Sequence, residues 1–145
     1  MNYSELVRDA IEARKMSYAP YSHWKVGAAL LTTTGEVYKG CNIENGGFTA
    51  TSCAERTAFF KAVSEGVYDF KAIAIAGGND KEGVKDYCYP CGVCRQVMSE
   101  FCLPDDFVII VGKNENDYKV HTLRELLPEA VYIAAKEGEG FRALD

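Results

Sequence analysis

Two short motifs contain the residues of this chain best suited to chemistry. Cys53 and Glu55 are separated by one residue, and Cys91 and Cys94 stand two residues apart after a proline. Cysteine thiolates are zinc ligands, and a zinc ion with three protein ligands keeps a fourth position open for catalysis. We therefore expect the three cysteines to hold one Zn²⁺ ion per chain and Glu55 to be the catalytic proton carrier. A redox pair and buried or disulfide-linked thiols are the alternatives for such spacing.

Glu55 has a rival role in helix capping. Ser52 and Glu55 have the spacing of a capping box, in which the glutamate binds the backbone N–H of the serine. Positions i and i+2 of a regular helix do not share a face. Glu55 therefore reaches a metal held by Cys53 only if Cys53 lies at the edge of the helix.

Cys88 precedes the second motif at the same two-residue spacing and needs a separate assignment. Three cysteines at this spacing also begin iron–sulfur cluster motifs. Such a motif needs a further cysteine, but Met98 stands at that position. A fourth thiolate would instead close the zinc site and make it structural. Tyr89 precedes a proline, so its backbone is held extended. We therefore expect Cys88 to lie in a loop, too far from the zinc ion to bind it. Cys41 and Cys102 are expected to be small buried hydrophobic residues.

The periodicity of apolar residues places both motifs in a series of helices and strands. Helices are expected over 4–16, from an N-cap at Ser52 up to Gly66, over 91–101 and from Thr122 to Leu127; strands are expected over 25–33, 36–41, 70–76, 107–111 and 118–120. This order predicts an α/β fold with a mixed β-sheet of about five strands and helices on both faces. One domain should span residues 1–145, with 129–145 left unassigned.

Both motifs open a predicted helix that follows a strand and a loop. The N-terminal ends of these two helices can then meet at one end of the sheet. Free backbone N–H groups and the helix dipole favour thiolate over thiol at such ends.

Composition excludes several classes of protein. The 145 residues are 48% hydrophobic and 26% charged with a net charge of −5, so the chain is neither disordered nor basic enough for duplex binding. No apolar run approaches the ~18–20 residues of a membrane helix. The polar, acidic start is not a signal peptide. We expect a cytoplasmic protein with a small ligand and with neither a nucleic-acid nor a membrane partner.

Four segments carry a resemblance to a known family. They are Y-A-P-Y-S-H-W-K-V-G-A-A-L-L (18–31), G-C-N-I-E-N-G-G-F (40–48), C-A-E-R-T-A (53–58) and P-C-G-V-C-R-Q (90–96). From about Glu5 to Pro128 the chain resembles the small zinc-dependent cytidine deaminases of pyrimidine salvage. The resemblance implies a cytidine deaminase-like fold and hydrolysis of cytidine and deoxycytidine to uridine and deoxyuridine plus ammonia.

The resemblance also implies roles for individual residues. Hydroxide generated by the zinc ion would attack C4 of cytosine, while Glu55 carries a proton from water to N3 and assists the departure of ammonia. Asn42 and Glu44 would bind the ribose, although turn formation is their alternative role. The remaining assignments are Cys53, Cys91 and Cys94 as zinc ligands, Trp24, Phe48 and Ala54 as further substrate contacts, and Arg56 as a hydrogen-bond donor to the thiolates.

Assembly is expected from the same resemblance, since the small deaminases form homotetramers. A neighbouring chain there completes each pocket with a phenylalanine that follows an L-L-P sequence. Val131 stands at that position here, so we expect Tyr132 or Phe141 to take its place. Phe59 and Phe60 are adjacent on a helix and cannot both face one core, so one is expected to face a partner.

Three other functions share part of this pattern. A nucleic-acid deaminase is disfavoured by Cys53, where that class usually has histidine, and by the net charge of −5. A zinc-stabilised binding module has no use for Glu55. A deaminase of a cytosine-containing antibiotic such as blasticidin S shares the zinc motifs but is disfavoured by Asn42 and Glu44.

Overall fold

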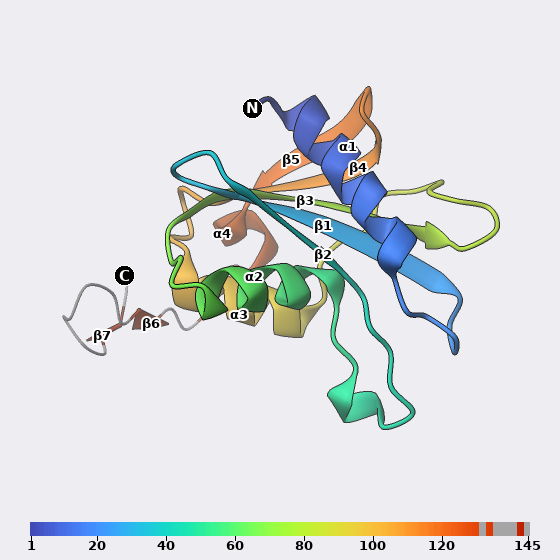
Figure 1. Cartoon of the computed structure of the whole chain (residues 1–145). Helices are drawn as coiled ribbons and strands as arrows, with labels where there is room; N and C mark the ends of the chain where they lie inside the picture. The colour runs from blue at the N-terminus through green and yellow to red at the C-terminus, as the bar shows by residue number, and fades with distance from the viewer. Residues whose placement is uncertain (131–132, 135–141, 144–145) are drawn as a thin grey trace.

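A five-stranded mixed sheet forms the centre of the computed structural model, which describes residues 1–130, 133–134 and 142–143 (Figure 1). Its strand order is β2-β1-β3-β4-β5, and β3 and β4 form the one parallel pair in it. The strands are β1 (Trp24–Thr32), β2 (Val37–Cys41), β3 (Phe70–Asn79), β4 (Val108–Asn114) and β5 (Asp117–Thr122), and a separate pair is formed by β6 (Ile133–Ala134) and β7 (Arg142–Ala143).

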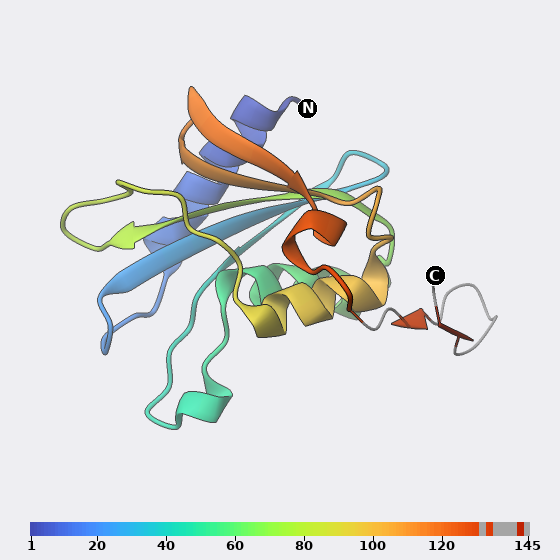
Figure 2. The same cartoon turned by 180° about the vertical axis from the view of Figure 1, so that it is seen from behind.

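Helices cover both faces of the sheet, as the sequence predicts (Figures 1 and 2). One face packs against α1 (Tyr3–Ala13), and the other packs against α2 (Ala54–Ser64), α3 (Gly92–Phe101) and α4 (Leu123–Leu126). Alternate strand residues supply the two cores, because successive side chains of a strand point to opposite faces. Ala28 and Leu30 pack toward α2, whereas Ala29 and Leu31 pack toward α1.

Gly40 allows α2 to lie directly against β2. A Cβ atom added at Gly40 would stand 2.5 Å from both the carbonyl oxygen of Ala54 and the amide nitrogen of Ala58. Since real Cβ atoms do not approach backbone so closely, glycine is required at this contact. The contact holds the first turn of α2, which carries Glu55, close to the end of the sheet.

The predicted capping box at the start of α2 is absent. Cys53 is the N-cap residue, in an extended conformation, and Ser52 instead exchanges two backbone hydrogen bonds with Ile43. The Ser52 hydroxyl contacts the Cys53 carbonyl and the Thr57 hydroxyl rather than a backbone N–H group of the first turn of α2. Cys53 therefore lies at the helix edge, the one position from which Cys53 and Glu55 can serve the same site.

Other element boundaries differ by a few residues. The first helix ends at Ala13 and continues as a 3₁₀ turn over Arg14–Met16. β3 extends to Asn79 because its ladder with β1 continues as far as Trp24. α4 has the predicted capping box between Thr122 and Glu125 but ends one residue earlier than expected. None of the helices in the described part of the chain combines the length and the apolar composition that crossing a bilayer requires.

Candidate metal centre and its cleft

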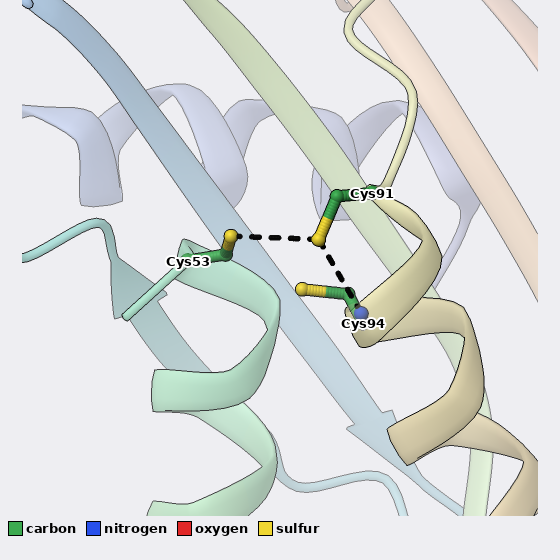
Figure 3. A group of neighbouring side chains, drawn as sticks. All are labelled: Cys53, Cys91 and Cys94. Atoms are coloured by element: carbon green, nitrogen blue, oxygen red, sulfur yellow. Dashed lines mark hydrogen bonds between the residues drawn. The ribbon is translucent and has the colours of Figure 1, made fainter. Parts of the chain in front are cut away.

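Three cysteine side chains converge where α2 and α3 begin (Figure 3). Cys53 is the N-cap of α2, Cys91 is the N-cap of α3, and Cys94 lies in the first turn of α3. Their sulfur atoms all lie within 4.8 Å of one another, and those of Cys53 and Cys91 are 3.6 Å apart. Two thiolates bound at ~2.3 Å to a tetrahedral zinc ion are about 3.8 Å apart, so the three side chains fit one zinc ion.

Hydrogen-bond donors lie close to two of the three sulfur atoms, and those around Cys53 favour its thiolate form. Arg56 donates from Nη2 to the Cys53 sulfur at 3.3 Å, and the Cys94 amide donates to the Cys91 sulfur at 3.4 Å. Hydrogen bonding from Cys94, and then from Arg56, lowers the pKa of Cys53 to about 5 despite its partial burial. The same contacts raise the pKa of Arg56, so its charge is permanent. The Cys53 thiolate is therefore available to a cation that binds deprotonated sulfur.

Glu55 is the one buried acidic side chain among residues 1–130, with 3% of its surface exposed. It lines the same cleft as Cys53 and Cys91. Burial is the main cause that raises its pKa to about 7, and the negative charge of Cys53 adds to this effect. A carboxyl group with such a pKa can both accept and release a proton near neutral pH.

The cleft beside the cysteines has a volume of about 340 Å³, which suits a small molecule. Cys91 is exposed whereas Cys94 is buried, so the cysteine cluster opens toward one side. The lining residues are Ser22, Trp24, Val26, Asn42, Glu44, Thr51, Ser52, Cys53, Ala54, Glu55, Cys88, Tyr89 and Cys91.

Asn42 and Glu44 line the cleft and also shape it. The Asn42 side chain accepts from the Val26 amide at 2.9 Å and donates to the Trp24 carbonyl at 2.8 Å. Glu44 accepts from the backbone amides of Tyr21 and Ser22 and from the Ser22 hydroxyl. The Asn42 bonds join the residue after β2 to the start of β1, and the Glu44 bonds reach the segment that precedes β1. Both side chains therefore bind residues about 20 positions earlier in the chain and not the turn before Gly46.

The predicted substrate contacts divide into two groups. Trp24, with 46% of its surface exposed, and Ala54 line the cleft with Asn42 and Glu44. Phe48 does not line it: the side chain is 83% exposed and belongs to a separate hollow shared with Tyr21. The reason is the 3₁₀ turn Phe48–Ala50, which lies at the tip of a loop that projects from the body of the chain (Figure 1).

Sequence reasoning identified Cys88 as a loop thiol outside the cysteine cluster but did not foresee its place at the cleft, and it missed Tyr89. Cys88 is not part of the three-cysteine cluster among the described residues, but it lines the cleft. It packs against Gly77, where an added Cβ would stand 2.6 Å from the Cys88 sulfur, and burial raises its pKa to about 11. For Tyr89 the available signal was its position directly before the Pro90-Cys91 motif, because a residue so close to Cys91 is brought near the cleft that Cys91 lines.

Comparison with known proteins identifies close relatives. Residues 1–111 match the family described as the cytidine and deoxycytidylate deaminase zinc-binding region. A cytidine deaminase of Sporosarcina psychrophila is 46% identical over 130 residues, covering 90% of this chain and 91% of the relative. A crystal structure of cytidine deaminase from Burkholderia pseudomallei is 41% identical with a TM-score of 0.80, covering 90% of this chain and 99% of that one. A blasticidin-S deaminase of Bacillus cereus is 38% identical over 127 residues, covering 86% and 88%.

Proposed function

We propose that this chain, which belongs to the cytidine and deoxycytidylate deaminase family, hydrolyses free cytidine and deoxycytidine to uridine and deoxyuridine with release of ammonia. One observation carries the proposal: a cluster of three cysteine sulfurs lies beside a cleft of about 340 Å³, and two of those cysteines line the cleft together with the buried Glu55. A deaminase needs these parts together, namely a metal centre, a proton carrier and room for one base.

Cys53, Cys91 and Cys94 hold the zinc ion in this proposal, one ion per chain. When bound, zinc supplies the Lewis acidity that makes a water molecule nucleophilic near neutral pH. Three thiolates leave an excess negative charge that opposes this effect. The Arg56 guanidinium, bonded to the Cys53 sulfur, and the N-terminal ends of α2 and α3 offset that charge.

Glu55 carries the protons of the reaction. It takes a proton from the attacking water and delivers it to N3 of the pyrimidine, while the oxygen adds at C4. It then passes the second proton to the amino group, which leaves as ammonia. Its burial supports this role, because a carboxyl group with its pKa raised to about 7 is efficient in both directions.

The chemistry of the cleft favours a nucleoside over a nucleotide. Among the described residues that line it, there is no lysine or arginine, whereas Glu44 and Glu55 are acidic. A phosphate group would therefore enter without a counter-ion and beside negative charge. Asn42 and Glu44, which have polar side chains, are proposed to face the sugar. Trp24 and Ala54 are proposed to face the base. Phe48 would reach a substrate only if its loop moved inward.

Blasticidin S is the second candidate substrate. The similarity to a blasticidin-S deaminase over 86% of this chain favours it. The nucleoside is preferred because Asn42 and Glu44 stand together at the cleft, where a diol fits.

We propose further that the chain forms a homotetramer. We also propose that it lies in the cytoplasm and serves pyrimidine salvage. Support for assembly comes from large side chains exposed in the segments 18–24 and 43–48: Tyr18, Tyr21, Trp24, Ile43 and Phe48. Phe59 is buried while its neighbour Phe60 is half exposed. All six cysteines are free thiols, which suits a reducing compartment. Tyr132 and Phe141, proposed to complete a neighbour's pocket, lie outside the described residues.

The deciding experiment mixes purified protein with one substrate at a time and follows pyrimidine absorbance. We expect turnover of cytidine and deoxycytidine, and little or none of deoxycytidylate, blasticidin S or a cytosine-containing oligonucleotide. The matched control is Glu55→Gln, which should abolish the signal without loss of zinc. Faster turnover of blasticidin S than of cytidine would replace the proposed substrate by the second candidate.

A further inference from the structure

Two aromatic side chains of this one chain line the cleft beside the metal centre. Among the described lining residues, Trp24 and Tyr89 are the ones with aromatic rings. Trp24 begins β1, and Tyr89 stands two residues before the ligand Cys91. The two segments are distant in sequence, so the fold brings both rings to one small space.

The Tyr89 ring is held in place although 40% of the residue's surface is exposed. Its hydroxyl oxygen lies 3.4 Å from Nε2 of His121 on β5, and the two ring centroids are 5.5 Å apart at 56°. The following residue is fixed too, because Arg95 donates to the Pro90 carbonyl at 2.8 Å. A ring anchored from both ends but left half exposed presents a preformed apolar surface to the cleft.

Tyr87, two residues earlier, shows what a purely structural tyrosine does in this segment. Its hydroxyl donates to Asp117 at 2.5 Å, and the ammonium groups of Lys113 and Lys119 lie 4.6 and 4.5 Å from its ring centroid. Tyr87 does not line the cleft. Tyr89 has fewer such contacts and lines the cleft, so its aromatic surface is available to a ligand.

We propose that Tyr89 is a base-recognition residue, whose ring packs against the planar pyrimidine and helps hold C4 beside the metal centre. This inference rests on the proposed function and deepens it. The chain then supplies an aromatic wall of its own cleft, independently of any residue from a neighbouring copy. The cleft should then prefer ligands with a planar base, because stacking requires the ligand ring to be as flat as the tyrosine ring.

The test compares Tyr89→Ala, Tyr89→Leu and Tyr89→Phe with a matched control, Tyr68→Ala, whose side chain is exposed outside the cleft. Three quantities are measured for each variant: zinc content, the KM and kcat for cytidine, and the binding of uridine. Binding is read from the fluorescence of Trp24, the chain's one tryptophan. The same titration with 5,6-dihydrouridine, whose base is not planar, isolates stacking from the contacts of the sugar.

Tyr89→Ala and Tyr89→Leu should raise the KM about 10-fold, the usual scale of one base–aromatic contact, with a smaller change in kcat. Both should also lose most of the preference for uridine over dihydrouridine, while Tyr89→Phe and Tyr68→Ala keep it and all four keep zinc. If Tyr89→Ala and Tyr89→Leu keep the wild-type KM and the preference for uridine over dihydrouridine, the inference on Tyr89 is wrong. The proposed function would stand in that case, because cytidine is still converted. A wild-type protein that neither converts cytidine nor binds uridine would overturn the proposed function, and this inference with it.

Discussion

Glu55 is distinguished from the other acidic side chains of residues 1–130 by burial next to a cluster of sulfur atoms. The substitution Glu55→Gln keeps its shape and some hydrogen bonding but removes proton transfer. We expect zinc content and the thermal midpoint to be retained, whereas kcat for cytidine falls at least ~100-fold. Steady-state kinetics and metal analysis on one preparation check both parts. Near-normal turnover would reduce Glu55 to a structural residue.

Cys88 and Cys91 are three positions apart, and comparing their substitutions tests which cysteines bind the metal. The Cys91 sulfur belongs to the three-cysteine cluster, whereas Cys88 packs against Gly77. Cys91→Ala should therefore lose the zinc ion and activity together, because two remaining thiolates hold the ion far more weakly. Cys88→Ala should keep about one zinc per chain, as atomic absorption would measure. Loss of zinc from Cys88→Ala would show that the site has four ligands.

Much of the candidate site could be predicted from the sequence, because metal ligands and proton carriers must be particular residue types at particular spacings. Cys53, Cys91, Cys94 and Glu55 were singled out in this way, and the structure brings them together. Tyr89 was not, since an aromatic residue beside a proline has no spacing rule. Whether such a ring faces a cleft depends on His121, which is 32 positions away.

At the scale of elements, the closeness of α2 and β2 controls where Glu55 stands. Gly40→Ala would push a Cβ against the backbone of Ala54 and Ala58, each 2.5 Å away. We expect a loss of about 1–3 kcal/mol of stability in denaturant unfolding, as for other overpacked sites, and a lower kcat because the start of α2 moves. Gly92→Ala is the control, since its Cβ would meet nothing within 4 Å. Equal stability of the two variants would contradict this account.

The capping box of α4 provides a prediction on pH. Hydrogen bonds from the Thr122 backbone and then its hydroxyl lower the pKa of Glu125. A carboxyl group with a lowered folded-state pKa adds stability above its ordinary pKa and loses that contribution as the pH falls through the lowered value. The thermal midpoint of Glu125→Gln should therefore lie below that of the wild type at about pH 7, with a smaller difference at about pH 3. A difference that is constant with pH would argue against the cap.

Elements were predictable where local signals and tertiary contacts agree. The alternation of Ala28 and Leu30 with Ala29 and Leu31 directs strand β1 to two cores, and the Thr122 cap depends on residues three positions apart. The cap at Ser52 failed as a prediction because Ile43, nine residues earlier, pairs with the Ser52 backbone. A rule based on spacing along the chain does not include such a competing partner. The end of β3 is not predictable from local sequence either, because it depends on how far β1 extends beside it.

At the scale of the whole molecule, large side chains are exposed in two segments next to the cleft-lining residues, 18–24 and 43–48: Tyr18, Tyr21, Trp24, Ile43 and Phe48. Phe48, with 83% of its surface exposed, has no core to stabilise in a single copy of the chain. Such a surface favours burial against another copy, because apolar area removed from water lowers the free energy of the assembly. We predict that light scattering gives about four times the chain mass of 16.0 kDa.

Phe48→Glu tests where the copies meet. A carboxylate buried in an apolar interface is costly, so this variant should dissociate into smaller species at concentrations where the wild type stays assembled. Val120→Glu is the control, because Val120 is 46% exposed on the edge strand β5, away from this surface. Zinc content should be equal in both, since neither residue contacts the cysteines. A wild type that is active and monomeric would reject assembly, and dissociation of both variants would place the interface elsewhere than the loop.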